Sequence, residues 1–133
     1  MIRRPPRSTL DRSSAASDVY KRQLMYRYLV GYKIGKNVFI GMKCYLDDLE
    51  PKQTIIEENV TVSYGCYFAL HGKGQKHSYI KICKGAYIGM RASIIAGNDG
   101  LTIGEKSIIG ACSLVNKDVP SNSKAVGVPA KII

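Results

Sequence analysis

The sequence predicts an all-β domain in which short parallel strands wind into a three-sided solenoid. Over residues 82–116 the chain reads in units of six: ICKGAY, IGMRAS, IGEKSI and IGACSL. An apolar residue leads each unit, and an alanine or serine follows it four positions later. A six-residue period fits neither a helix nor the two-residue alternation of a single strand. It fits a short strand and a corner, repeated, so that each coil buries its apolar side against its neighbours.

Four triplets of this unit run along the chain, and each is long enough for one turn of a three-sided prism. Within a triplet the leading apolar residues are six apart. They are Ile34, Ile40 and Leu46; Ile56, Val62 and Phe68; Ile82, Ile88 and Ile94; and Ile103, Ile109 and Val115. We expect residues 33–126 to form a parallel β-helix of about four coils, with these side chains pointing inward and strands about 4.8 Å apart.

Residues that tolerate a sharp turn stand between the predicted strands. Asn37, Asn59, Gly65 and Gly85 adopt positive φ more readily than other residue types, so we expect them at corners.

Three segments interrupt the period. Residues 47–54 contain Pro51 and three acidic residues, and GNDG occupies 97–100, so both segments read as turns or loops. The longest interruption lies between Phe68 and Ile82 and holds HGKGQKHSY, with both histidines of the chain. A long excursion from a rigid scaffold is where function usually resides.

Residues 1–23 do not follow the repeat. They are rich in Arg and Ser and lack the apolar stretch of a secretory signal. We expect this leader to lie outside the fold, as a non-native, adapter-like translation or as a disordered basic arm. The β-helix domain is then 24–133, in which 24–30 reads as the end of a helix on the first coil. The foreign leader and the ending at Ile133 suggest a gene fragment, truncated at both ends.

The formal charge of +10 overstates the basic character of the domain. The leader holds six basic and two acidic residues, so +6 remains, spread over the coils. Without interleaved aromatic residues or a groove-reading helix, this pattern predicts no nucleic-acid partner. It suits a ligand with phosphates, an acidic glycan, or simply solvated lysines. No apolar run reaches membrane-spanning length, so we expect no membrane insertion.

The four cysteines predict no metal site. Cys44 and Cys66 occupy the small inward position of the repeat, Cys112 sits at a corner, and Cys83 stands where glycine is more frequent. There is no CxxC spacing, and two histidines make a Cys/His zinc site improbable. Free thiols indicate a reducing compartment, and we expect a cytoplasmic protein.

The IGxxA/S repeats and the ending VNKDVPSNSKAVGVPAKII resemble the hexapeptide-repeat acyltransferases over roughly residues 33–133, and among them the maltose, galactoside and polysaccharide O-acetyltransferases. The resemblance implies a left-handed β-helix, although about 98% of parallel connections are right-handed. It also implies a homotrimer that moves an acetyl group from acetyl-coenzyme A to a hydroxyl of a sugar or polysaccharide precursor. No metal is needed for that chemistry.

His71 is the candidate catalytic base, because it directly follows a predicted strand at the position where this family carries its catalytic histidine. Acyl transfer to a hydroxyl requires a base, and a neutral imidazole is suited to that role near pH 7. His77 either lines the acceptor pocket or is a solvated loop residue. The group that orients His71 stays open between Asp47, Asp48 and a backbone carbonyl.

The resemblance also implies a coenzyme site in a groove between neighbouring subunits. Met90 and Ala111 match positions whose backbone contacts the pantetheine arm. Asn116 and Lys117 match a Thr-Lys pair near the nucleotide, although Asn replaces the usual Thr. Lys131 matches a basic residue facing the phosphates, where Arg is frequent and would bind in bidentate fashion.

Three other functions use a similar prism. A γ-type carbonic anhydrase needs three histidines around zinc, and this chain has two. An ice-binding β-helix would show Thr-x-Thr ladders, which are absent from the sequence. A non-catalytic structural or assembly subunit remains the alternative, and release of coenzyme A in the presence of sugars distinguishes it from an enzyme.

Overall fold

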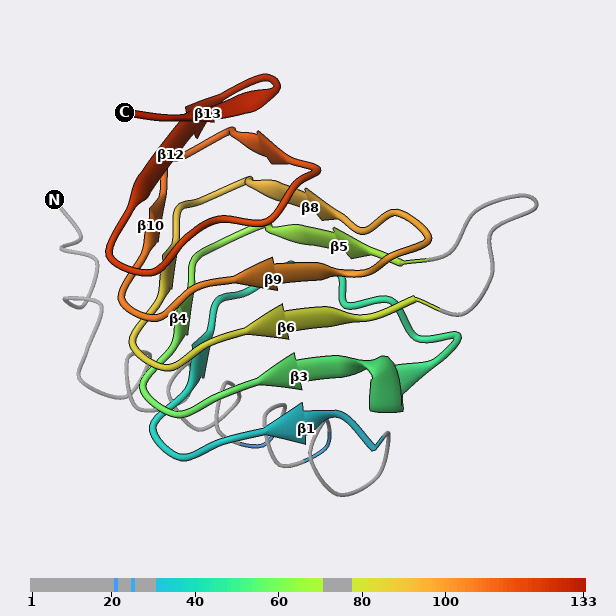
Figure 1. Ribbon diagram of the computed structural model, residues 1–133. Helices are drawn as coiled ribbons and strands as arrows, with labels where there is room; N and C mark the ends of the chain where they lie inside the picture. The colour runs from blue at the N-terminus through green and yellow to red at the C-terminus, as the bar shows by residue number, and fades with distance from the viewer. Residues whose placement is uncertain (1–20, 22–24, 26–30, 71–77) are drawn as a thin grey trace, which may run out of the picture.

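The computed structural model describes residues 21, 25, 31–70 and 78–133. Its strands form the three faces of a prism, and neighbouring strands of a face belong to successive coils (Figure 1). The first face holds β1 (Lys33–Ile34), β3 (Thr54–Ile56), β6 (Ile80–Ile82) and β9 (Leu101–Ile103). The second holds β2 (Phe39–Ile40), β4 (Thr61–Val62), β7 (Tyr87–Ile88), β10 (Ile108–Ile109) and β12 (Lys124–Gly127). The third holds β5 (Tyr67–Ala69), β8 (Ser93–Ile95) and β11 (Leu114–Val115).

Two elements depart from the parallel stack. The last strand, β13 (Ala130–Ile132), folds back antiparallel on β12 and closes the C-terminal end. In the first coil, a turn of 3-10 helix, η2 (Pro51–Gln53), interrupts the predicted loop at 47–54. The expectations for the leader and for a helical end at 24–30 lie outside the described residues, apart from Lys21 and Met25, which are both helical.

The coil is left-handed. In Figure 1 the strands of the first face point left across the front, and those of the third face point right across the back. The chain rises from β1 at the bottom to β13 at the top while it makes these turns. The handedness implied by the resemblance is therefore confirmed, against the general preference of parallel connections for the right-handed crossover.

The six-residue repeat sets the register between coils. In the first face Ile56 pairs with Ile34 of the coil before and with Ile82 of the coil after. In the second face Val62 lies in the same way between Ile40 and Ile88. Each leading residue of a triplet thus stacks on its equivalent one coil away, as predicted.

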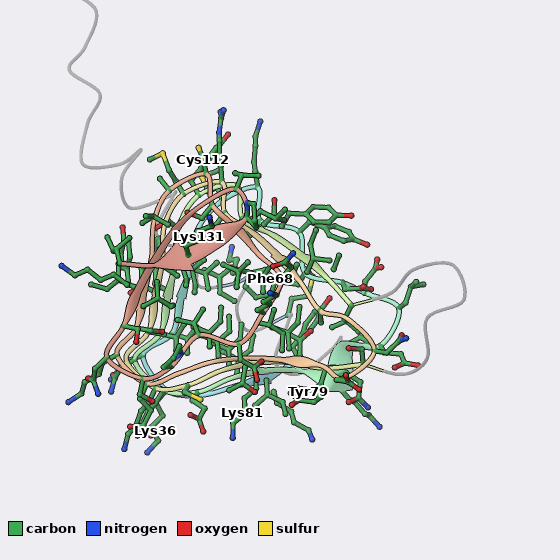
Figure 2. The ribbon with its side chains drawn as sticks, turned by 45° about the horizontal axis from the view of Figure 1, so that its top comes forward. Lys36, Phe68, Tyr79, Lys81, Cys112 and Lys131 are labelled. Carbon is green, nitrogen blue, oxygen red and sulfur yellow. The ribbon has the colours of Figure 1, made fainter. Side chains whose placement is uncertain are left out.

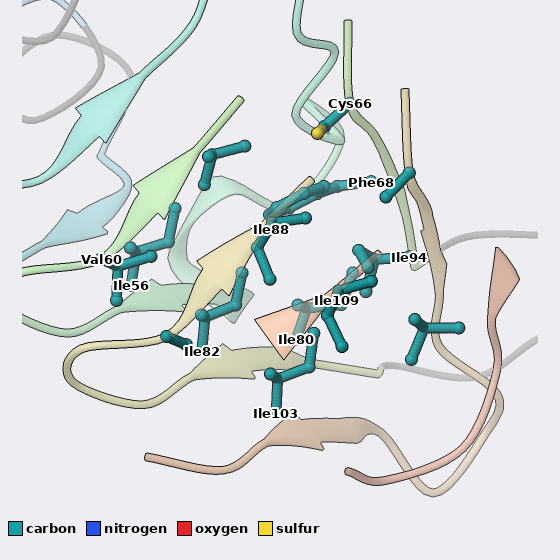
Figure 3. Packing of buried hydrophobic residues seen from close by; sticks show 14 of the residues in the cluster. Ile56, Val60, Cys66, Phe68, Ile80, Ile82, Ile88, Ile94, Ile103 and Ile109 are labelled. Carbon is teal, nitrogen blue, oxygen red and sulfur yellow. The ribbon is translucent and has the colours of Figure 1, made fainter. Parts of the chain in front are cut away.

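The stacked leading residues form the core of the prism (Figure 3). All of them are buried except Ile34, which is partly buried and packs against the core. Ile34 belongs to β1, the first strand of its sheet, so among the described residues it has a stacked neighbour on one side only. The small residues four positions on are also buried, apart from the partly buried Cys44.

The predicted corner residues adopt the left-handed conformation. Asn37 and Asn59 have φ of 53° and 59°, and Gly65 and Gly85 have 70° and 73°. Five further non-glycine residues in the described part of the chain take positive φ at corners, and all but Asn122 are residue types that rarely adopt it. They are Lys43, Arg91, Lys106, Cys112 and Asn122. The stacking of coils therefore imposes this conformation even where the residue type disfavours it.

The glycine of the IG motif has a different role, which is to let the next coil pass close by. A Cβ atom on Gly89 would lie 2.6 Å from the amide nitrogen of Ala111 and 2.7 Å from the carbonyl oxygen of Ile109. Both atoms belong to the backbone of the next coil, so neither can move aside without shifting a strand. The repeat therefore favours glycine here for space rather than for backbone freedom.

Replacing Gly89 with alanine should destabilise the protein. Overpacking of this kind costs about 1–3 kcal/mol, which corresponds to a melting temperature lowered by at least about 4 °C in a domain of this size. Gly97→Ala is the matched control, because a Cβ there would meet nothing within 4 Å. Calorimetry showing the same melting temperature for both variants would contradict this packing.

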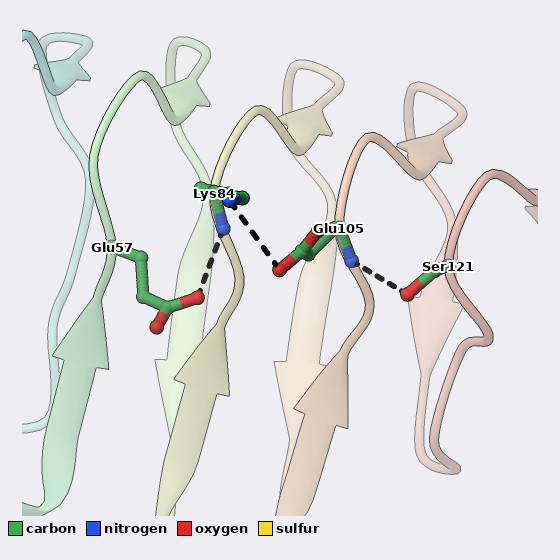
Figure 4. A network of polar contacts seen from close by, with 4 residues as sticks. All are labelled: Glu57, Lys84, Glu105 and Ser121. Atoms are coloured by element: carbon green, nitrogen blue, oxygen red, sulfur yellow. Dashed lines mark hydrogen bonds and ion pairs between the residues drawn. The ribbon is translucent and has the colours of Figure 1, made fainter.

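Polar groups tie successive coils together at the corner between the first and second faces (Figure 4). The amide of Lys84 donates to Oε1 of Glu57 at 3.1 Å, and the amide of Glu105 donates to Oγ of Ser121 at 3.1 Å. The Lys84 ammonium lies 4.0 Å from Oε1 of Glu105, and both side chains are about half exposed. An exposed ion pair of this kind adds little stability. The hydrogen bonds donated by the two backbone amides therefore contribute more to holding the coils together.

Candidate functional site

The breaks in the repeat that the structure describes fall at one edge of the prism, the corner between the third and first faces. The segments at 47–53 and 97–100 occupy this edge, on the right of Figure 1, and Leu70 and Ser78, which border 71–77 in the sequence, lie at the same edge. His71 and His77 lie outside the described residues, so the site is built here from the residues that border 71–77. Those residues are Leu70, which follows β5, and Ser78, which precedes β6.

A buried carboxylate holds the chain where 71–77 begins. The amide of Leu70 donates to Oδ2 of Asp47 at 2.9 Å, and the amide of Leu49 donates to Oδ1 at 3.2 Å. Asp47 is only 4% exposed, and its own carbonyl oxygen accepts a bond from the buried Tyr32 hydroxyl at 3.1 Å. A carboxylate of the first coil thus fixes the strand end of the second coil.

Asp48 has a different environment. Its side chain is exposed, and its Oδ1 accepts a hydrogen bond from the Tyr45 hydroxyl at 3.3 Å. The sequence left Asp47 and Asp48 as alternatives for the group that orients His71. Of the two, Asp47 accepts the hydrogen bond from Leu70, the residue directly before His71.

A buried hydroxyl and a ring hold the chain where 71–77 ends. Ser78, which is 3% exposed, donates from Oγ to the carbonyl oxygen of Gly97 at 2.5 Å. The Tyr79 ring lies across Gly100, where any Cβ would overlap it. The predicted turn at 97–100 is confirmed by the bond from the Gly100 amide to the Gly97 carbonyl at 3.1 Å. The residues that border 71–77 are therefore anchored, Leu70 to the coil before it and Ser78 to the coil after.

The five predicted coenzyme residues fall into two groups. Met90 and Ala111 lie in successive coils at the corner between the second and third faces, and the Cys112 amide bonds the Met90 carbonyl at 2.9 Å. Lys131 pairs with Val126, which packs above Gly110 at the same corner. Figure 2 shows Lys131 and Cys112 close to this corner, with Tyr79 and Lys36 near the other two.

Asn116 and Lys117 lie apart from the other three. They follow β11 at the opposite end of the third face, close to the edge where Leu70 and Ser78 lie. All five side chains are exposed. Within one chain the five residues form no single pocket, but they fit a long ligand with anionic groups. Ala111 has a small, exposed side chain, and the two lysines present exposed positive charge.

The cysteines whose pKa is shifted are poor nucleophiles. A hydrogen bond with Cys44, followed by burial, raises the pKa of Cys66 far above its usual range. Burial and the nearby Glu57 carboxylate raise the pKa of Cys83. Both thiols are protonated near neutral pH, whereas attack on an acyl group needs the thiolate. No group of three His, Cys, Asp or Glu side chains in the described part of the chain could hold a metal ion.

Two features of this region were missed from the sequence. The first is the pair of anchors at Ser78 and Tyr79, which carry no motif. The second is a stack of Tyr45 on Tyr67, with ring centroids 4.8 Å apart and an interplanar angle of 18°. Each tyrosine directly precedes a leading residue of the repeat, Leu46 or Phe68. That shared position was the available signal.

No protein-family model matches the chain. The galactoside O-acetyltransferase of Escherichia coli (strain K12) is 35% identical over 118 residues, which are 78% of this chain and 57% of that protein. A hexapeptide-repeat acetyltransferase of Vibrio cholerae, solved with acetyl-coenzyme A, has the same fold, with a TM-score of 0.65 and 22% identity over 86% of this chain and 75% of its own. The chain is a relative of the hexapeptide-repeat acetyltransferases.

A second solved structure that is similar to this chain is a serine acetyltransferase. The enzyme of Brucella abortus strain S19, in complex with coenzyme A, is 31% identical with a TM-score of 0.63 and covers 77% of this chain and 39% of its own. The chain spans about half the length of the curated relatives it matches. No helix within the described ranges is long and apolar enough to cross a membrane.

Proposed function

We propose that the protein transfers an acetyl group from acetyl-coenzyme A to a hydroxyl group of a sugar or polysaccharide precursor. The observation that carries this proposal is the 35% identity to a galactoside O-acetyltransferase over 78% of the chain. Support for the donor comes from the relatives solved with coenzyme A or acetyl-coenzyme A.

The proposed reaction is a direct attack within a ternary complex. His71 removes the proton of the acceptor hydroxyl as its oxygen bonds to the thioester carbonyl carbon. Backbone amides stabilise the oxyanion that develops on that carbonyl. When the oxyanion collapses, the carbon–sulfur bond breaks and the His71 imidazolium returns the proton to the departing thiolate. The protonated Cys66 and Cys83 favour this route over an acyl-enzyme.

Asp47 is proposed to position the base. Its carboxylate accepts a hydrogen bond from the Leu70 amide at 2.9 Å, so it fixes the residue directly before His71. His77 is proposed to line the acceptor site. The coenzyme is proposed to lie between neighbouring subunits, with its pantetheine arm along Met90 and Ala111 and its charged end near Asn116, Lys117 and Lys131. The four free thiols support a cytoplasmic location.

Release of the coenzyme A thiol tests the proposal. Wild-type protein is incubated with acetyl-coenzyme A and a panel of galactosides, maltose and other sugars, and the free thiol is followed with a chromogenic disulfide. We expect release above the hydrolytic background with at least one sugar. Absence of release with every acceptor would favour the alternative, a non-catalytic structural subunit.

We also propose that the protein is a homotrimer. The outward side of the second face carries exposed apolar side chains in three of its coils, with Phe39 48%, Tyr87 46% and Ile108 41% exposed, and Thr61 lies between Phe39 and Tyr87. A second copy of the chain packed on this row would remove apolar surface from water. The three-fold symmetry comes from the family resemblance.

Light scattering should therefore give about three times the 14.6 kDa chain mass. Ile108→Lys should weaken the assembly, because it replaces an apolar side chain of this row with a charge that the subunit contact would bury. A stable wild-type monomer across the micromolar range would contradict the proposal.

A further inference from the structure

A row of outward side chains crosses the four coils of the third face. Strand pairing and an isolated bridge place Tyr45, Tyr67, Ser93 and Leu114 one above another in successive coils. Their inward neighbours, such as Phe68 in Figure 2, fill the core. The Tyr45 and Tyr67 rings stack at 4.8 Å and are 41% and 47% exposed. We call these four residues the tyrosine row.

The row has a gap one coil high. Tyr45 covers one side of the Tyr67 ring, but the next position holds Ser93, whose side chain is too short to cover the other side. Successive coils are about 4.8 Å apart, so a flat ring placed at the level of Ser93 would stack on Tyr67 at ordinary contact distance. Leu114 lies one coil further on and would close the gap from above.

The polar groups at the Tyr45 end of the row, on the other side of Tyr67 from the gap, suit hydroxyls better than phosphates. The exposed Asp48 carboxylate accepts a bond from the Tyr45 hydroxyl at 3.3 Å. Desolvation, followed by the charges of Asp48 and Asp47, raises the pKa of Tyr45, so this end of the row carries a negative field and a neutral phenol. Such a surface repels the phosphates of a nucleotide and can exchange hydrogen bonds with a polyol.

The row also lies close to the candidate site. Tyr67 is the first residue of β5 and Leu70 directly follows that strand, so three extended residues, about 10 Å, separate them. Leu70 is the residue that Asp47 anchors at the start of 71–77. A sugar stacked on Tyr67 would therefore reach toward the edge where acetyl transfer is proposed.

We propose that Tyr67, backed by Tyr45 and flanked by Ser93, is the stacking platform for the acceptor, and that the acceptor is a neutral pyranoside with an apolar C–H face. The negative face of an aromatic ring attracts the slightly positive C–H bonds of such a sugar face. Ser93 and the Tyr67 hydroxyl bind the equatorial hydroxyls at its rim. This inference rests on the proposed function for the reaction but concerns a binding step that occurs without the donor.

The test measures glycoside binding without acetyl-coenzyme A. Methyl β-D-galactopyranoside and maltose are titrated into the full chain and binding is followed by ligand-observed NMR. Tyr67→Ala and Tyr67→Leu should both raise the dissociation constant about 3–10-fold, as expected for a lost aromatic contact. Tyr67→Phe should bind almost as well as wild type. Tyr64→Ala is the matched control, since Tyr64 is 40% exposed in the same coil but at a corner, and it should bind normally.

The outcomes separate this inference from the proposed function. Unchanged binding in the Tyr67→Ala and Tyr67→Leu variants would overturn the platform even if the enzyme acetylates sugars. Glycoside binding that depends on Tyr67 would support it even if no acetyl transfer is seen. A wild-type protein that binds neither glycoside would also overturn the platform. So would a Tyr67→Leu variant that loses its oligomeric mass, because that result would show that the tyrosine row is a subunit contact.

Discussion

Replacing His71 with alanine is expected to lower turnover about 10²–10⁴-fold, the usual loss on removal of a general base. The alcohol would then have to attack without transfer of its proton to a positioned imidazole. Coenzyme A binding should persist, because three of the residues proposed to contact it, Met90, Ala111 and Lys131, lie at or beside another corner. Initial rates of thiol release, together with calorimetric titration of coenzyme A, check both parts of this expectation.

His77→Ala is the control for this experiment. His77 lies in the same segment but is proposed only to line the acceptor site, so its loss should raise KM for the acceptor more than it lowers kcat. Normal turnover in His71→Ala combined with loss of turnover in His77→Ala would show that the two roles were exchanged.

Asp47→Asn separates positioning from catalysis in the same assay. The amide oxygen of asparagine can still accept the Leu70 bond, whereas Asp47→Ala removes that acceptor from a buried site. A larger loss of kcat in Asp47→Ala than in Asp47→Asn would support a role in placing the strand end. Equal losses would indicate that the negative charge itself is required.

Replacing Ile88 with aspartate is expected to abolish folding. Ile88 is fully buried in the second face and lies between Val62 of one coil and Ile109 of the next (Figure 3). An unpaired carboxylate there costs several kcal/mol even after protonation, and a natural domain has only about 5–15 kcal/mol of stability. Soluble expression and the circular dichroism spectrum are the measurements.

Ile95→Asp provides the matched control for the core variant. Ile95 belongs to β8 of the same coil but points outward and is 40% exposed. The same substitution should therefore leave the protein folded, with a change in stability of about 0.5 kcal/mol or less. A soluble, native-like Ile88→Asp protein would show that the predicted register is wrong.

The coil architecture could be predicted from the sequence because each coil repeats the same pattern of inward and corner residues. A six-residue unit must place one bulky residue inward, such as Ile56 or Ile82, and turn a corner with a residue such as Asn59. The same pattern recurs in every unit, so a residue that departs from it at a single position does not obscure the period. The handedness needed the family resemblance, since the repeat spacing is the same for either hand.

The site was only partly readable. The sequence identified the segment that holds both histidines and named two candidate aspartates, but it could not rank Asp47 against Asp48. That ranking depends on which carboxylate turns inward beneath Leu70, 23 residues further along the chain. The spread of the coenzyme residues over two corners was likewise hidden, because positions six apart in sequence lie on different faces.

What the sequence determined by itself is therefore the repeated part of the molecule: the number of predicted triplets, their inward residues and the place of the long excursion. Only the tertiary structure decided which residues of different coils meet, including the Asp47–Leu70 bond, the Ser78–Gly97 bond and the stacking of Tyr45 on Tyr67. The physical reason is the separation along the chain of the residues that interact. The period acts on neighbours within a unit, whereas these contacts join residues 19 to 23 positions apart, whose alignment depends on the length of every corner and loop between them.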